Sequence, residues 1–109
     1  MLTIRVPDKP SFSVVRSPKW PAVRSRWLKQ QPVCQVCDRT NKLEVHHIIP
    51  FHIDPSLELH PTNFITLCES AGACCHYIVG HCAISWLKYD PYVLHDAAII
   101  RSMRQAARP

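Results

Sequence analysis

The cysteine spacing is the feature that most constrains how this chain can fold. Cys34 and Cys37 form a C-x-x-C pair, in which one knuckle places two thiolates at neighbouring corners of a tetrahedral zinc site. Cys68 with Cys75, or with Cys74, would supply the second pair. Four protein ligands leave the ion no open position, so we expect the zinc to be structural. The alternatives are a redox pair at Cys34 and Cys37, which lacks the usual βαβ surroundings, or buried thiols without a metal. We expect Cys82 and the unused member of Cys74 and Cys75 to be core thiols.

The size of the chain makes such a metal site useful. The chain has 109 residues, 47% of them apolar, and one core of this size stabilises a domain by only a few kcal/mol. No signal-like segment opens the sequence, and no stretch approaches the roughly 18 apolar residues that a membrane span needs. We therefore expect no membrane association and a cytoplasmic location, where thiols stay reduced and available to metals.

The charges are distributed unevenly along the chain. Residues 1–42 contain nine Lys and Arg against two acids, and residues 101–109 add three Arg without an acid. Residues 43–100 contain one Lys, six acids and all seven His. Basic ends around a histidine-rich centre suit a polyanion such as DNA, although a solvated basic surface would look the same. The residues predicted to contact DNA phosphates are Lys19, Arg24, Arg26, Lys29, Arg101 and Arg104.

Local patterns predict the order helix, knuckle, strand, loop, strand, helix, helix. An extended arm at 1–16 precedes a single domain at 17–109, with a motif core at 34–88. Ser17 and Pro18 indicate the start of an amphipathic helix that ends near Gln31. Trp20 and Trp27 lie on its apolar stripe, and we expect them, like Trp86, to pack in the core. The remaining expected elements are a knuckle at 34–41, strands at 43–49 and 63–67, a loop at 51–62, and helices at 74–87 and 91–107.

Five separated elements together resemble a known family. They are the Cys34 and Cys37 pair, the run from Leu43 to Pro50 with His46 and His47, then Asn63, then Leu67-Cys68, then Cys75-His76. In order and spacing over residues 34–76, this pattern resembles the zinc-containing HNH endonucleases of small bacterial or phage type. The resemblance implies an α+β fold with a ββα-metal core, in which two strands and a helix surround one divalent ion. The zinc knuckle would stabilise this core, and helices would flank it at both ends.

The resemblance also implies roles for individual residues. His46 and His76 match the metal ligands, His47 matches the general base, and Asn63 matches the residue that orients this base. The implied activity is hydrolysis of DNA to a 5′ phosphate and a 3′ hydroxyl, as an endonuclease or nickase with one metal ion. The chemistry requires the same residue types, because a neutral histidine accepts a proton from water near neutral pH. Imidazole ligands widen the choice of ion from Mg²⁺ to Mn²⁺, Co²⁺, Ni²⁺ or Zn²⁺.

The sequence departs from the family pattern in two places. The stretch 51–62 lacks the glycine turn frequent in the family, and Val79 stands where many members have lysine. His81 would supply a third metal ligand only if the helix is distorted, because an α-helix places residue i+5 about 140° away from residue i. We expect His52, His60 and His95 to be exposed or hydrogen-bonded histidines without a metal.

Two further classes of function remain alternatives at this stage. A non-catalytic, zinc-stabilised nucleic-acid-binding module would share the cysteines and the charge, but would not need His46, His47, Asn63 and His76 together. A component of a larger phage or bacterial complex, such as one for DNA packaging, is compatible with catalysis. With one motif per chain, cutting both strands would require a homodimer or two successive nicks.

Overall fold

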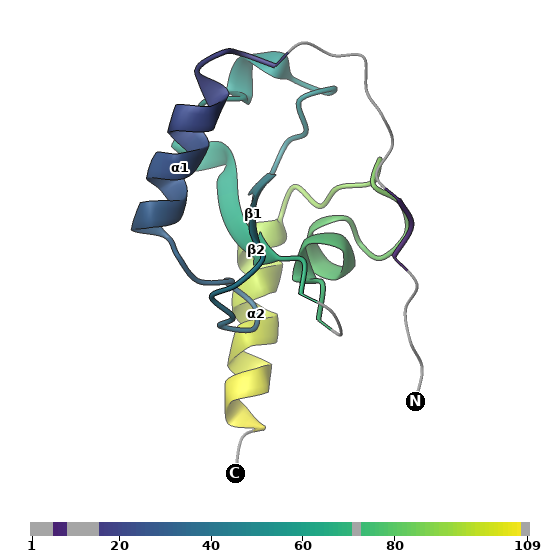
Figure 1. The fold of residues 1–109 in the computed structure, drawn as a ribbon. Coiled ribbons are helices and arrows are strands. Elements are labelled where there is room, and N and C mark those ends of the chain that lie inside the picture. The colour runs from purple at the N-terminus through teal and green to yellow at the C-terminus, as the bar shows by residue number, and fades with distance from the viewer. Residues whose placement is uncertain (1–5, 9–15, 71–72, 108–109) are drawn as a thin grey trace.

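The structure is a computed structural model that describes residues 6–8, 16–70 and 73–107. Helix α1 (Trp20–Gln30) is followed by strands β1 (Leu43–His47) and β2 (Phe64–Cys68), a short π-helix, η3 (His76–Gly80), and helix α2 (Val93–Ala106). Two 3₁₀ turns, η1 (Pro55–Leu57) and η2 (Pro61–Asn63), lie between the strands. In Figure 1 the two long helices lie on either side of the small sheet. This arrangement confirms the expected α+β class with a ββα core and flanking helices.

The two strands form an antiparallel pair in which β2 is fully buried. Leu43 pairs with Cys68 at one end and His47 pairs with Phe64 at the other. All five residues of β2 are buried, and successive side chains point to opposite faces of the sheet. Phe64 and Thr66 contact tryptophans of α1, whereas Ile65 and Leu67 join the core that includes Val93 of α2. The sheet is therefore covered on both faces.

Helix α1 begins later than the sequence patterns predicted. It starts at Trp20, with Lys19 at the N-cap position and no side-chain cap. The Ser17 hydroxyl accepts a hydrogen bond from the Lys19 N–H, and the Ser17 N–H donates to the Glu58 carboxylate, but the helix begins only at Trp20. No residue of α1 is fully buried, so its tryptophans pack at the edge of the core rather than inside it.

The predicted helix at 74–87 is wrong in length and type. Only His76–Gly80 forms a helical segment, and it is a π-helix. Cys82 and Ala83 then adopt positive φ angles of 61° and 53°, which end the helix and turn the chain back. The Cys82 side chain is exposed, so the expectation that it is a core thiol is also wrong.

Helix α2 agrees with its predicted range to within two residues at each end. Val93 and Ala97 are its buried residues, and they pack against the cluster that contains the knuckle cysteines. Arg101 forms an ion pair with Asp38 of the knuckle. No helix in the described ranges has both the length and the apolar character needed to cross a membrane.

Candidate active site

Four buried cysteines meet at one end of the hairpin. The sulfur atoms of Cys34, Cys37, Cys68 and Cys75 lie within 4.8 Å of one another. Cys74 is not part of this group; it has a φ of 36° in the turn before η3 and is only partly buried. The structure therefore brings together the first of the two cysteine sets that the spacing allowed.

The chemistry of this cysteine group fits a zinc ion. A hydrogen bond with Cys75 lowers the pKa of Cys34 to about 4, and the same contact together with burial raises the pKa of Cys75. Burial also raises the pKa of Cys37. Without a counter-charge these thiolates oppose one another, whereas a dication bound by all four would stabilise their ionised forms. Tetrahedral four-sulfur sites are typical of structural zinc.

Three histidines converge beside the sheet and form a second group. The ligand nitrogens of His46, His76 and His81 lie within 4.8 Å of one another. His46 is 2% exposed, and its Nε2 atom is buried without a hydrogen-bond partner in the described part of the chain. Burial, followed by the neighbouring His76 and His81, lowers the pKa of His46 well below its usual value. A neutral, buried imidazole with an unpartnered nitrogen is suited to bind a metal ion.

The other two imidazoles of this group are held through their Nδ1 atoms. His76 Nδ1 lies 2.8 Å from a Glu69 carboxylate oxygen, and His81 Nδ1 donates to the Lys88 carbonyl at 2.7 Å. Their Nε2 atoms lie 3.3 Å apart. Outer contacts of this kind orient metal-binding histidines and fix which nitrogen is available. The wider turn of the π-helix gives the distortion that His81 needs to share a face with His76.

His47 lies on the strand next to His46 but has a different environment. Its Nε2 atom lies 2.9 Å from the Glu58 carbonyl oxygen, which can only accept, so Nε2 carries the proton and Nδ1 has the lone pair. Trp20 packs against the ring at a centroid distance of 4.7 Å. Burial lowers the pKa of His47, the Glu58 carbonyl opposes this shift, and the positive charge of Arg16 adds to it. His47 is thus a neutral imidazole with a fixed tautomer.

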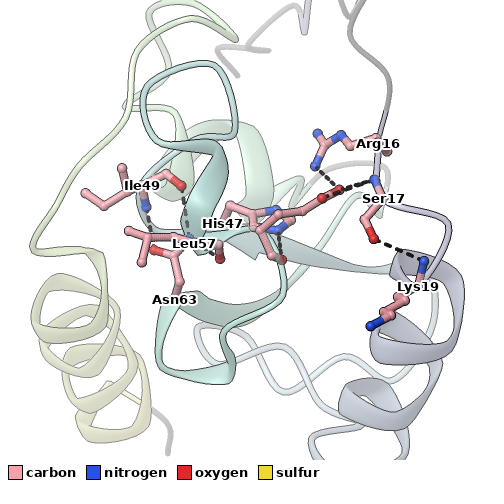
Figure 2. A network of polar contacts seen from close by, with 8 residues as sticks. Arg16, Ser17, Lys19, His47, Ile49, Leu57 and Asn63 are labelled. Atoms are coloured by element: carbon pink, nitrogen blue, oxygen red, sulfur yellow. Dashed lines mark hydrogen bonds and ion pairs between the residues drawn. The ribbon is translucent and has the colours of Figure 1, made fainter.

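Asn63 supports the loop that carries this histidine's partner. Its Oδ1 accepts from the Ile49 N–H at 2.8 Å, and its Nδ2 donates to the Ile49 carbonyl at 3.0 Å and the Leu57 carbonyl at 3.4 Å (Figure 2). Leu57 directly precedes Glu58, the residue bonded to His47. The side chain of Asn63 therefore bonds the backbone on either side of the turn, rather than the backbone of His47 itself.

A cleft of about 400 Å³ joins the two histidine environments. Its lining includes the three converging histidines, His47, two arginines and several aromatic side chains. The full set is Arg16, Trp20, Arg24, Glu44, Val45, His46, His47, Pro50, Phe51, His52, His76, His81 and Trp86. The group of three histidines and His47 thus face the same cleft.

The predicted DNA contacts have different places in the structure. Of the six basic residues, only Arg24 lines the cleft, where it bonds Glu44 and the Leu43 carbonyl. Arg101 is paired with Asp38, and the exposed Lys19, Arg26, Lys29 and Arg104 are not among the residues that line the cleft. His52, His60 and His95 are exposed, as expected, and His52 also lines the cleft.

Two residues of this site had no signal in the sequence. Arg16 was assigned to the N-terminal arm, and Glu58 to an irregular loop. These two residues lie 42 positions apart in the sequence, yet their side chains form an ion pair in the structure. The Glu58 carboxylate also accepts a hydrogen bond from the Ser17 N–H. Only the folded chain brings them to His47.

Comparison with known proteins gave one match. The family model for the HNH endonuclease matches residues 34–79, which include the knuckle, both strands, His46, His47, Asn63 and His76. Searches of curated proteins and of solved structures found nothing that matches the chain.

Proposed function

We propose that the protein is a metal-dependent endonuclease or nickase that hydrolyses DNA, on the premise that residues 34–79 match the family model for the HNH endonuclease. One observation carries the proposal. His47 has a fixed tautomer with its lone pair on Nδ1, and it shares a cleft with three converging imidazoles. A module that only binds nucleic acid has no need for this combination.

His47 acts as the general base in the proposed reaction. Its Nδ1 removes a proton from a water molecule, whose oxygen attacks phosphorus as the bond to the 3′ oxygen breaks. The leaving oxygen takes a proton from solvent, which gives a 5′ phosphate and a 3′ hydroxyl. The Glu58 carbonyl holds the ring throughout, because Nε2–H donates to it in the resting protein. Asn63 keeps the segment that presents this carbonyl in place.

We assign His46, His76 and His81 as the ligands of the catalytic divalent ion. The unpartnered Nε2 of His46 and the two outer contacts on His76 and His81 support this assignment. When bound, the ion would bind a phosphate oxygen and stabilise the developing charge on the leaving oxygen. Three nitrogen ligands favour Mn²⁺, Co²⁺, Ni²⁺ or Zn²⁺ and do not exclude Mg²⁺.

The cellular context follows from the same chemistry. Free thiols that bind zinc require a reducing compartment, so we propose action in the cytoplasm of a bacterium or a phage-infected cell. One motif per chain implies single-strand nicking by a monomer, or double-strand cutting by a homodimer.

Plasmid cleavage tests the proposal. Supercoiled plasmid is incubated with wild type, His47→Ala or His95→Ala in Mg²⁺, Mn²⁺ or Ni²⁺, and zinc content and folding are measured for each protein. His95 is an exposed histidine of α2 outside the cleft, which makes it a matched control. We expect His47→Ala to lose cleavage by roughly 10²- to 10⁴-fold while keeping zinc and fold.

The outcomes separate the functional classes. If His47→Ala keeps its fold and zinc but cleaves as fast as His95→Ala, His47 is not the base. If wild type with zinc bound binds DNA but does not cleave it with any ion, the non-catalytic module is the better assignment. The ratio of nicked to linear product reports whether one strand or both are cut.

A further inference from the structure

Arg16 and Arg24 are the two arginines that line the cleft, and their hydrogen bonding differs. Arg24 donates to a Glu44 carboxylate oxygen at 3.1 Å and to the Leu43 carbonyl at 3.4 Å. Arg16 makes no hydrogen bond through its guanidinium within the described residues, and its nearest carboxylate oxygen, on Glu58, is 3.8 Å away. The guanidinium donors of Arg16 are therefore available to a ligand in the cleft.

Contacts of the guanidinium with Phe51 and Glu58 restrict the orientation of the Arg16 side chain. Its central carbon lies 4.9 Å from the centre of the Phe51 ring, and Glu58 attracts it from one side. The Glu58 side chain is only 6% exposed and is fixed by the Ser17 N–H, whereas the Arg16 side chain is 47% exposed. Figure 2 shows Arg16 next to Ser17, in the same network of polar contacts as His47. The guanidinium is thus oriented by Phe51 and Glu58 while the side chain remains about half exposed.

The link to the general base runs through Glu58. The carboxylate of Glu58 faces Arg16, and its backbone carbonyl accepts from His47 Nε2 at 2.9 Å. One buried residue, Glu58, thus contacts both Arg16 and His47, and both of these side chains line the cleft. A planar guanidinium with open donors in such a place is suited to a phosphate, which it can bind through two oxygens.

We propose that Arg16 binds a backbone phosphate of the nucleic acid beside the bond that His47 attacks, and that Glu58 and Phe51 hold it ready. This inference rests on the proposed function, since it assigns a further contact to the same substrate. It adds one contact to those expected from the basic residues of α1 and the C-terminal tail.

Equilibrium binding tests the proposal without requiring cleavage. In a His47→Ala background, Arg16→Met, Arg16→Lys and Lys42→Met are compared for binding to a fluorescein-labelled DNA duplex by anisotropy over a range of salt concentrations. Lys42 is an exposed lysine outside the cleft and is not among the predicted DNA contacts, so its variant measures what the loss of one positive charge costs. Zinc content and circular dichroism establish that each variant is folded.

We expect Arg16→Met to raise Kd by roughly tenfold and to lower the slope of log Kd against log salt by about 0.9. Arg16→Lys should keep the salt slope and recover much of the affinity, because it retains the charge and loses the planar fork. If Arg16→Met and Lys42→Met change Kd and slope equally, or if Arg16→Met changes neither, the proposal is wrong. Failure of wild type to cleave plasmid would instead contradict the proposed activity, and the binding comparison would still decide the role of Arg16.

Discussion

His81 shows how one side chain can change the character of a metal site. With His46 and His76 alone, the proposed metal site would have two imidazole ligands, and His81 completes a set of three whose nitrogens lie within 4.8 Å of one another. Its ring is fixed by the Lys88 carbonyl and packed against Trp86 at a centroid distance of 4.8 Å. A ligand held this firmly loses little freedom when an ion binds.

Replacement of His81 therefore tests the three-histidine assignment. We expect His81→Ala to weaken Co²⁺ or Ni²⁺ binding by more than the roughly 10- to 100-fold that loss of an outer contact costs, because a direct ligand is removed. Isothermal titration on zinc-loaded protein measures the affinity. His52→Ala is the matched control, since His52 lines the same cleft but lies outside the group of three. Equal affinities for the two variants would remove His81 from the site.

Replacement of Glu69, which contacts His76 on the side away from the proposed metal, should weaken metal binding less than loss of His81 does. Its carboxylate lies 2.8 Å from His76 Nδ1, so we expect Glu69→Gln to lower affinity for the catalytic ion by roughly 10- to 100-fold. Glu44→Gln removes a cleft carboxylate that bonds Arg24 instead of a histidine, and serves as the control. The same titration reports both. Unchanged affinity in Glu69→Gln would mean that the contact does not orient the ligand.

Among the elements, the π-helix has the most specific role, and Gly80 shows how tightly it is packed. A Cβ atom at Gly80 would lie 3.1 Å from His46 Cε1 and Nδ1 and 3.1 Å from Leu67 Cδ1. Both side chains are buried, and two of the three contacts are to the His46 ring, so this ring would have to shift. The absence of a side chain at position 80 thus allows η3 to approach β1 and β2 closely.

Gly80→Ala should disturb the histidine site more than the zinc site. We expect weaker binding of the catalytic ion and slower cleavage, because a displaced His46 ring no longer converges with His76 and His81. Zinc content should stay at the wild-type level, since the cysteine sulfurs lie outside the contacts of this Cβ. Metal analysis and single-turnover cleavage measure the two effects. Loss of zinc together with activity would show that the whole fold had been disrupted instead.

The loop between the strands depends on Asn63. Asn63→Ala leaves the Ile49 N–H and two carbonyls without their partner, and we expect a loss of about 1–3 kcal/mol in the free energy of unfolding. Cleavage should fall as well, because Leu57 and Glu58 are no longer held beside His47. Asn63→Asp keeps an acceptor for the Ile49 N–H and should lie between alanine and wild type. Urea unfolding and kcat measurements test this order.

At the scale of the whole molecule, the cysteine group joins segments that lie far apart in the sequence. The knuckle, the end of β2, the start of η3 and helix α2 all meet in the cluster around it. Cys34→Ser should therefore lose zinc and unfold, since structural zinc contributes about 10–16 kcal/mol in small peptides, as much as the entire stability of many domains. Circular dichroism and zinc release measure this. Cys82→Ser, at an exposed position outside the group, should keep both zinc and fold.

Much of this molecule could be predicted where the signal is local. The C-x-x-C knuckle and the adjacent His46 and His47 have fixed covalent spacing, and α2 follows from an apolar period that its burial preserves. The start of α1 was predicted too early: the Ser17 hydroxyl does accept from the Lys19 N–H, but Pro18 and Lys19 form a turn ahead of the helix. The helix at 74–87 was predicted too long because His81 and Trp86 gain more from packing than from helical geometry.

The sequence alone determined which residues can do chemistry, since thiols, imidazoles and their short spacings are properties of the covalent chain. Tertiary structure decided which of them meet. It favoured Cys75 over Cys74, brought His81 to His46 through a π-helical turn, and placed Arg16 and Glu58 next to His47. These choices depend on the paths of irregular segments, and such paths are set by long-range contacts that leave no periodic pattern in the sequence.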